Sequence, residues 1–359
     1  MKKILTVVGA RPQFVKAAAL SREFKKHSSI EELIIHTGQH FDKNMSEVFF
    51  EEMDIPKPAF QLAVNNATHG AMTGRMLIEI EHVLLDQKPD VVLVYGDTNS
   101  TLAGALAARK LHIPLAHVEA GLRSFNMAMP EEVNRILTDR ISNLLFCPTD
   151  HAVNNLKKEG FADFDSQIVK SGDVMEDAVQ FYKQKALSTS QVLAKNGLKE
   201  NDYILGTIHR AENTDDQNRL LGILNAFEEM TSELPVVIPI HPRTRKILEG
   251  LGKNWNIQFI DPVGYFDMLA LLNHCSIVVT DSGGLQKEAF FMRKFCVTTR
   301  DQTEWLELVE EGYNFVAGAD TDIITNNIKR CLQSKYPSIQ NLYGNGQASS
   351  IICNTLLAQ

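Results

Sequence analysis

Residues 91–98 read Val-Val-Leu-Val-Tyr-Gly-Asp-Thr, an unbroken apolar run that stops at a glycine and a carboxylate. A run without polar residues is typical of a strand buried on both faces, as in a parallel sheet covered by helices. Residues 277–284, Ile-Val-Val-Thr-Asp-Ser-Gly-Gly, repeat this pattern, again with an acid where the apolar run ends. Both stretches predict a doubly wound α/β sheet with polar groups at the carboxyl ends of its strands.

Apolar runs of this kind alternate with amphipathic helical stretches throughout the 359 residues. The expected strands are residues 4–8, 33–36, 91–95, 115–118 and 144–147 in the first half, and 203–208, 236–240, 257–260, 277–280 and 296–299 in the second. Such alternation builds parallel βαβ units, and the length suits two domains. We therefore expect a Rossmann-like N-terminal domain over residues 1–170 and a second one over residues 171–343, with a polar stretch near residues 188–201 close to the junction.

The composition is that of an ordinary globular protein, with 44% hydrophobic and 22% charged residues and a net charge of -8. This acidic balance argues against nucleic acid as a partner, because binding a phosphate backbone needs clustered Lys and Arg. No stretch approaches the roughly 20 apolar residues that span a bilayer, so no membrane partner is expected. Five scattered cysteines without a C-x-x-C pair predict reduced thiols in a cytoplasmic protein. No H-E-x-x-H or cysteine ligand set predicts a metal.

Four ionisable side chains follow expected strands or begin an expected helix. Asp97 and Glu119 follow neighbouring strands and should face the same edge of the sheet, and His209 follows the first strand of the second half. Glu131 lies after Pro130 at a helix start, where a carboxylate also simply complements the helix dipole. Together, in a cleft between two sets of strand ends, these four side chains favour acid–base chemistry over a purely structural role.

Two further strand ends are candidate anion sites. Arg11 follows the first strand in Gly-Ala-Arg-Pro, without the G-x-G-x-x-G dinucleotide fingerprint, and offers a planar fork to phosphate oxygens. Ser282 can cap a helix whose glycines, Gly283 and Gly284, let backbone N–H groups approach an anion. Glu288, one turn further, is either a partner for a ribose diol or a solvated helix residue.

Taken together, these motifs resemble the non-hydrolysing UDP-N-acetylglucosamine 2-epimerase family, and the resemblance runs nearly end to end. The stretches that carry it are Gly-Ala-Arg-Pro at 9–12, His-Thr-Gly-Gln-His at 36–40, Gly-Asp-Thr at 96–98, His-Val-Glu-Ala-Gly-Leu-Arg at 117–123, Pro-Glu-Glu-Val-Asn-Arg at 130–135, Thr-Ile-His-Arg-Ala-Glu-Asn at 207–213, His-Pro at 241–242, residues 280–288 and Arg-Asp-Gln-Thr-Glu at 300–304. The resemblance implies a GT-B-like fold, in which two Rossmann-like domains face a central cleft and a last helix at about residues 344–359 packs back on the first domain. It also implies a UDP-sugar substrate, a homodimer, and neither cofactor nor metal.

The family's chemistry explains the acid–base groups. A pyranose C2–H is not acidic, so inversion at C2 proceeds by loss of UDP to give a 2-acetamidoglycal, followed by addition of UDP after a proton returns on the other face. By this resemblance the catalytic residues are Asp97, Glu119, Glu131 and His209. The substrate-binding residues are Arg11, Arg123, Arg135, Arg243, Ser282, Gly283, Gly284 and Glu288. A second, activating UDP-sugar would involve Gln39, His40, Arg75, Arg210 and His241.

Departures from the family pattern bear on the substrate. Gln13 stands where the family usually has an acid, and Arg243 follows His-Pro in place of the usual Asn. With these departures, the motifs resemble the branch of the family that acts on UDP-2,3-diacetamido-2,3-dideoxy-glucuronate for O-antigen or capsule synthesis. Both changes would favour an anionic sugar if either side chain reaches it. The alternatives are the parent activity on UDP-N-acetylglucosamine, a hydrolysing epimerase, a GT-B glycosyltransferase and a UDP-sugar-binding regulator.

Overall fold

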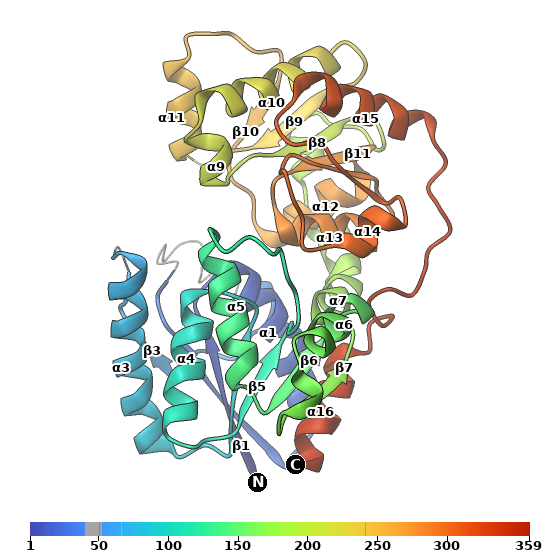
Figure 1. Cartoon of the computed structure of the whole chain (residues 1–359). Coiled ribbons are helices and arrows are strands. Elements are labelled where there is room, and N and C mark those ends of the chain that lie inside the picture. Colours follow the sequence, from blue (N-terminus) through green and yellow to red (C-terminus); the bar gives the residue numbers. More distant parts are fainter. Residues whose placement is uncertain (40–49, 51, 66, 241) are drawn as a thin grey trace. The chain divides into compact units, whose positions relative to one another are not determined.

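Two compact units make up the protein, here described from a computed structural model (Figure 1). The first consists of Met1–Gln180 together with Asn341–Gln359, and the second of Phe181–Gln340. The structure describes residues 1–39, 50, 52–65, 67–240 and 242–359. Among these residues, no helix is both long and apolar enough to cross a membrane.

The first unit is built on a seven-stranded parallel sheet with the order β3-β2-β1-β4-β5-β6-β7. Its strands are β1 (Lys2–Val8), β2 (Ile30–His36), β3 (Phe60–Gln61), β4 (Val91–Tyr95), β5 (Leu115–Val118), β6 (Leu144–Cys147) and β7 (Gln167–Lys170). In register, Leu5 of β1 lies between Leu33 of β2 and Val92 of β4. The strand order therefore reverses between β1 and β4, and in open sheets ligands bind beside such a reversal at the carboxyl ends of the strands.

Helices cover both faces of this sheet. They are α1 (Arg11–Phe24), α3 (His69–Gln87), α4 (Asn99–Lys110), α5 (Pro130–Ile141), α6 (Asp150–Lys158), the 3₁₀ turn η1 (Phe161–Asp163), α7 (Val174–Thr189), which continues into the second unit, and α16 (Ala348–Ala358). Figure 1 shows α3, α4 and α5 side by side in front of the strands, with α1 behind them. Proline begins α5 and stands in the first turn of α1, where its missing N–H costs no hydrogen bond. Thr98 caps α4 by accepting the N–H of Thr101 at 3.2 Å.

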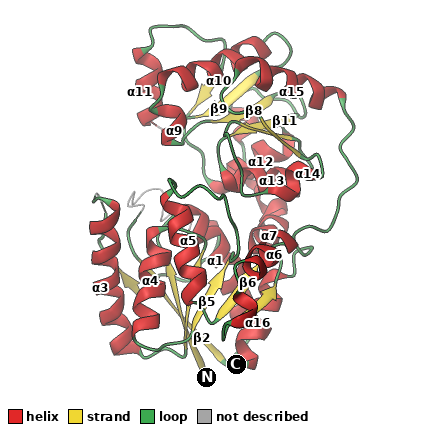
Figure 2. Ribbon diagram, viewed as in Figure 1, coloured by secondary structure: helices red, strands yellow, loops and turns green. Residues whose placement is uncertain are grey.

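The second unit repeats this plan with a six-stranded parallel sheet of order β10-β9-β8-β11-β12-β13 (Figure 2). Its strands are β8 (Ile204–Thr207), β9 (Val236–Pro239), β10 (Gln258–Ile260), β11 (Ile277–Thr280), β12 (Cys296–Thr298) and β13 (Asn314–Val316). Its helices are α8 (Val192–Lys195), α9 (Ala211–Thr214), α10 (Gln217–Met230), α11 (Pro242–Gly250), α12 (Tyr265–His274), α13 (Gly283–Phe291), α14 (Leu306–Glu310) and α15 (Thr321–Gln333). Leu224 of α10 and Ile324 of α15 pack with strand residues such as Val279 in one buried cluster. The strand order reverses between β8 and β11.

The last helix returns to the first unit, where α16 contacts α1. Asp177 of α7 accepts the N–H groups of Ala348 and Ser349 at 3.2 and 2.7 Å, which satisfies donors that the start of α16 leaves without partners. At the other end of α16, Lys2 Nζ donates to the carbonyl oxygen of Leu356 at 2.6 Å. Both ends of α16 are therefore held by side chains of the first unit.

The predicted fold class, with two doubly wound parallel sheets, is confirmed. All ten expected strands are present, several with the expected limits. The sequence did not predict three strands, β3, β7 and β13. Each is only two to four residues long and lies at a sheet edge, and most of its side chains are half-buried or exposed, so it carries no continuous apolar run.

Candidate active site

The expected acid–base residues of the first unit lie at the reversal of its strand order. Asp97 follows β4, and its carboxylate pairs with the guanidinium of Arg135 on α5. Arg135 also pairs with Glu132 at 2.5 Å, while Asn134 Nδ2 donates to the Asp97 carbonyl oxygen at 2.9 Å. The Asp97 side chain is 29% exposed, whereas that of Arg135 is 4% exposed. Arg135 therefore binds the Asp97 carboxylate on its buried side, and the other side of the carboxylate stays accessible.

Glu119 follows β5, the strand next to β4, and its carboxylate pairs with Lys16 Nζ from α1. Both side chains are nearly buried, with 9% and 6% exposure. A Cβ atom on Gly96 would lie 3.0 Å from Glu119 Oε2, so the carboxylate rests against the residue that precedes Asp97. Glu119 itself has a φ of 73°, a left-handed conformation that is uncommon outside glycine and often marks a functional position. Asp97 and Glu119 are thus brought together, each beside a cation.

The turn after β1 is closed by Gln13. Its Oε1 accepts the N–H groups of Gly9 and Ala10 at 2.8 and 3.0 Å, and its Nε2 donates to the carbonyl oxygen of Tyr95 at 2.9 Å. Gln13 is 1% exposed, so it does not reach a ligand, and the expectation that it meets an anionic sugar finds no support here. Arg11, in the same turn, is partly buried; burial lowers the pKa of its guanidinium, and the charge of Glu52 opposes this shift.

In the second unit, His209 follows β8 and Asp281 follows β11, the two strands at the reversal of strand order. His209 Nδ1 lies 2.7 Å from Asp281 Oδ1, and the backbone N–H groups of His209 and Arg210 each donate to Asp281 Oδ2 at 3.0 Å. Asn213 Nδ2 adds a fourth donor at 3.2 Å. Burial alone would raise the pKa of Asp281, but the hydrogen bond and charge of His209, with the two backbone N–H groups, outweigh it and lower that pKa.

This arrangement fixes the ring of His209. The Asp281 side chain is fully buried, while that of His209 is 54% exposed. Because an ionised carboxylate only accepts hydrogen bonds, Nδ1 carries a proton, and Nε2 is the ring nitrogen left for a ligand. A buried carboxylate behind a half-exposed imidazole is an arrangement that enzymes use to orient a proton donor or acceptor.

The expected anion site lies at the start of α13. Ser282 caps the helix, and its Oγ accepts the N–H of Leu285 at 3.4 Å, as the sequence predicts. A Cβ atom on Gly283 would lie 2.5 Å from Glu304 Oε1, so only glycine fits without movement. The N–H groups of the first helical turn, which include that of Gly284, have no partner within the helix and can bind an anion. Glu288 is 7% exposed and faces Tyr265; burial raises the pKa of this tyrosine, and the Glu288 carboxylate adds to the effect.

Two expected site residues occupy places that the sequence did not indicate. Arg123, expected to bind substrate, is 2% exposed, and its guanidinium donates to Asp139 and Glu159 at 2.7 to 2.8 Å. This placement gives it a role within the protein rather than at a ligand. Glu131 is half-buried in the first turn of α5, and no hydrogen bond joins it to Asp97 or Glu119 within the described part of the chain.

The expected residues for an activating ligand belong to both units. Gln39 Oε1 accepts the N–H and hydroxyl of Ser100 at 3.1 and 2.8 Å, Arg75 is exposed on α3, and the backbone of Arg210 precedes α9 in the second unit. His40, His241 and the side chain of Arg243 lie outside the described residues.

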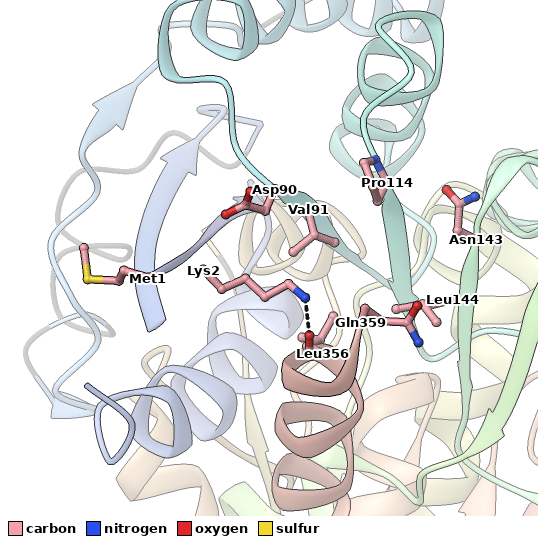
Figure 3. A pocket seen from close by; sticks show the side chains of 9 residues that line it. All are labelled: Met1, Lys2, Asp90, Val91, Pro114, Asn143, Leu144, Leu356 and Gln359. Carbon is pink, nitrogen blue, oxygen red and sulfur yellow. Dashed lines mark hydrogen bonds between the residues drawn. The ribbon is translucent and has the colours of Figure 1, made fainter. Parts of the chain in front are cut away.

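A pocket of about 520 Å³ opens at the opposite edge of the first sheet, where β4, β5 and β6 begin (Figure 3). Lys2 points across it to the end of α16, and the lining residues are Met1, Lys2, Asp90, Val91, Pro114, Asn143, Leu144, Leu356 and Gln359. Open α/β sheets bind ligands at the carboxyl ends of strands, so this pocket is not the candidate site. Across the described ranges, no three His, Cys, Asp or Glu side chains gather as metal ligands.

Comparison with known proteins identifies the family of the chain. The sequence model described as UDP-N-acetylglucosamine 2-epimerase matches residues 22–357. The chain belongs to this family. The UDP-2,3-diacetamido-2,3-dideoxy-D-glucuronate 2-epimerase of Pseudomonas aeruginosa is 56% identical over 355 residues, which cover 99% of each chain.

Solved structures of epimerases extend the similarity to three dimensions. The UDP-GlcNAc 2-epimerase of Methanocaldococcus jannaschii in complex with UDP-GlcNAc and UDP is 42% identical, with a TM-score of 0.91 over 100% of this chain and 99% of its own. That of Neisseria meningitidis bound to UDP-GlcNAc is 32% identical, with a TM-score of 0.91 over 99% and 100%. The chain is therefore an isomerase of the UDP-sugar 2-epimerase family with a GT-B-like fold.

The sequence did not single out two residues of this candidate site. Lys16 was missed because a lysine within a helix is usually a surface residue. The sequence does place it five residues after Arg11, on the helix that follows the first strand, and this is the one feature that could have indicated it. Asp281 was visible at a strand end, but its role depends on the distance to His209, a residue 72 positions away.

Proposed function

We propose that this epimerase interconverts UDP-2,3-diacetamido-2,3-dideoxy-D-glucuronate and its C2 epimer by elimination and re-addition of UDP. The observation that carries the mechanism is the pairing of Asp97 with Arg135 and of Glu119 with Lys16 at adjacent strand ends. The similarity to the Pseudomonas aeruginosa enzyme named for this substrate supports the choice of sugar.

In the proposed reaction, a carboxylate removes the proton from C2 of the sugar. The C2–H electron pair forms a C1=C2 double bond while the C1–O bond breaks, and its electrons leave with the β-phosphate oxygen of UDP. The 2-acetamidoglycal then receives a proton at C2 on its other face, and UDP adds back to C1. Because two faces are served, two acid–base groups are needed, and Asp97 and Glu119 take these roles, with Glu131 as a third candidate.

The second unit holds the leaving group in this proposal. The start of α13, with Ser282, Gly283 and Gly284, binds phosphate oxygens, and Glu288 binds the ribose. His209, held by Asp281, donates from Nε2 to the phosphate that gains charge as the C1–O bond breaks. Arg11 of the first unit offers a second cation to the same phosphates.

Proton NMR in deuterated water tests the proposal. The enzyme is given UDP-2,3-diacetamido-glucuronate and UDP-N-acetylglucosamine in separate samples, and the C2 proton signal and the product are followed. We expect loss of the C2 signal and a manno product from the uronate, without accumulation of free UDP. Exchange only with UDP-N-acetylglucosamine would reject the uronate, and no exchange with either would reject epimerisation.

UDP-N-acetylglucosamine is the second candidate substrate, because the two similar solved structures bind this sugar nucleotide. The two sugars differ at C3 and C6, where the uronate carries an acetamido group and a carboxylate. Arg243 remains the candidate partner for that carboxylate. Replacing it with alanine should weaken use of the uronate selectively, and an unchanged preference would remove Arg243 from the proposal.

The proposal also includes a homodimer formed through α3. Ile78 and Leu85 lie seven residues apart on this helix and are 52% and 55% exposed, which suits a helix seam against a second copy. Replacing both with glutamate should give a monomer in light scattering, whereas an unchanged mass would exclude this face. A cytoplasmic location fits the five buried free thiols, and O-antigen or capsule synthesis is the pathway that consumes such a sugar in this proposal.

Regulation by a second, activating UDP-sugar remains a proposal that rests on Gln39, Arg75, Arg210 and the two histidines outside the described residues. Its signature is sigmoidal dependence of the rate on substrate, which a preparation with Arg75→Ala should lose.

A further inference from the structure

Three buried side chains and one partly exposed side chain form a linked series of charged groups next to the ends of β4 and β5. His117 of β5 lies 2.7 Å from Asp139 of α5, Asp139 lies 2.7 Å from Arg123, and Arg123 pairs with Glu159 through two bonds. His117 and Asp139 are fully buried and Arg123 is 2% exposed. The reaction proposed above uses none of them directly.

Both ring nitrogens of His117 face acceptors. Nδ1 lies 2.7 Å from Asp139 Oδ1, and Nε2 lies 2.7 Å from the carbonyl oxygen of Gly96. A carbonyl cannot donate, so Nε2 carries a proton. Asp139 Oδ2 accepts the N–H of Gly121 at 3.1 Å and that of Arg123 at 2.7 Å, and such donors favour the ionised carboxylate. Nδ1 therefore also carries a proton, and His117 is an imidazolium.

Charge balance makes this burial tolerable. The signs alternate along His117, Asp139, Arg123 and Glu159, and the last side chain is 34% exposed. Burial would raise the pKa of Asp139, but the hydrogen bonds and charges of His117 and Arg123 outweigh it and lower that pKa. Paired and fully hydrogen-bonded charges avoid the cost of an isolated buried charge.

These bonds end on the two turns that carry the candidate acid–base residues. The carbonyl held by His117 belongs to Gly96, the residue before Asp97, and the N–H held by Asp139 belongs to Gly121, two residues after Glu119. Glu119 keeps its left-handed φ of 73° between these points, with its N–H donating to the Phe146 carbonyl oxygen at 3.1 Å. The Asp139 carboxylate is thus linked to both turns, directly through Gly121 and indirectly through His117 and Gly96.

We infer that Asp139 and His117 are positioning residues that hold Asp97 and Glu119 at a fixed mutual geometry through hydrogen bonds to Gly96 and Gly121. The inference rests on the proposed epimerase function. A displacement of about 1 Å at a reacting group can lower a rate about 10²-fold, so loss of this link should lower kcat strongly. It should change KM little, because the hydrogen bonds of Asp139 and His117 reach none of the proposed phosphate-binding residues, Arg11 and Ser282 to Gly284.

Two variants separate hydrogen bonding from charge. Asp139→Ala removes every bond that Asp139 makes, and kcat should fall about 10²-fold while KM stays within about threefold. Asp139→Asn can donate from Nδ2 to a neutral His117 and still accept from Arg123 and Gly121 through Oδ1, so it should retain kcat within about tenfold. Asp150→Asn, which removes an exposed carboxylate paired with Lys170 in the same unit, is the matched control and should change nothing.

Nitrogen-15 NMR of histidine-labelled protein shows directly which ring nitrogens of His117 are protonated, and it needs no substrate. In the wild type, His117 should show two protonated ring nitrogens, and in Asp139→Asn only one. An unprotonated nitrogen in the wild type, or a folded Asp139→Ala variant with unchanged kcat, would overturn the inference. If Asp139→Ala does not fold, the inference is tested by the protonation of the His117 ring in the wild type and by kcat of the Asp139→Asn variant. Failure of the wild type to exchange the C2 proton would instead count against the proposed function.

Discussion

Asp281→Asn tests how His209 is used. The substitution keeps the size of the side chain, and the remaining oxygen can still accept the backbone N–H groups of His209 and Arg210. Its amide N–H₂ would face His209 Nδ1, 2.7 Å away in the wild type, and would force the proton to Nε2 of a neutral ring. The proposal has Nδ1 protonated beside the carboxylate while Nε2 donates to the departing phosphate; the neutral ring of the variant cannot hold both protons, so it brings no positive charge to that phosphate.

The magnitudes follow from these contacts. A hydrogen bond to a charged group contributes about 1.5–3 kcal/mol. Because His209 is half-exposed, solvent screening reduces this, and we expect a loss of about 1–2 kcal/mol in unfolding free energy. General acid catalysis contributes about 10²–10⁴-fold, so kcat should fall by at least about 10²-fold. Since the folded-state pKa of Asp281 is lowered, its stabilisation is present above the ordinary aspartate pKa of about 3.9 and is lost as the pH falls.

The assay follows C2-proton exchange by NMR beside chemical unfolding at several pH values. Glu229→Gln, which removes a half-exposed carboxylate paired with Lys329 in the same unit, is the control and should behave as the wild type. The stability difference between wild type and Asp281→Asn should be full at pH 7 and shrink below about pH 4. An Asp281→Asn enzyme that exchanges the C2 proton at the wild-type rate would refute the role given to the Asp281–His209 pair.

Three other substitutions or treatments probe the rest of the structure. Lys16→Met leaves the buried carboxylate of Glu119 without its cation, so unfolding in urea should show a loss of about 3 kcal/mol in unfolding free energy. The double variant Lys16→Met with Glu119→Gln should recover most of this stability yet stay inactive. A double variant as unstable as the single one would argue against the ion pair. Asp177→Ala removes the acceptor at the start of α16 and should cost about 1–2 kcal/mol, measured by thermal unfolding, with little change in kcat. Because burial raises the pKa of Cys275 and Cys296 to about 12, and the other three thiols are also buried, a thiol reagent should label the native protein slowly and all five thiols after unfolding; rapid native labelling would contradict this burial.

Local sequence patterns predicted those features that depend on neighbouring residues. Continuous apolar runs located ten strands, and Pro130 and Ser282 marked the starts of α5 and α13. The strand ends therefore indicated where Asp97, Glu119 and His209 would lie. The short strand β7 has only two apolar residues, Ile168 and Val169, both half-buried between exposed polar ones, and so carried no such signal.

Contacts between distant residues could not be predicted in the same way. The family resemblance implies that Arg123 and Arg135 bind substrate, yet each is buried against carboxylates on other elements. Gln13 looks like a loss of charge at the substrate, although its amide closes the turn after β1. These partners are distant in the sequence, by as many as 82 residues for Gln13 and Tyr95. Only the folded chain therefore shows which polar groups remain available to a ligand.

Positional isotope exchange tests the central claim, elimination and re-addition of UDP, most directly. A UDP-2,3-diacetamido-glucuronate with oxygen-18 in the bridge between the sugar and the β-phosphate is incubated with the enzyme, and phosphorus NMR follows the label. If UDP leaves and returns, the bridging label should scramble into the non-bridging β-phosphate positions at a rate comparable to epimerisation. Epimerisation with the label retained in the bridge would contradict C1–O cleavage and with it the roles given to His209 and the start of α13.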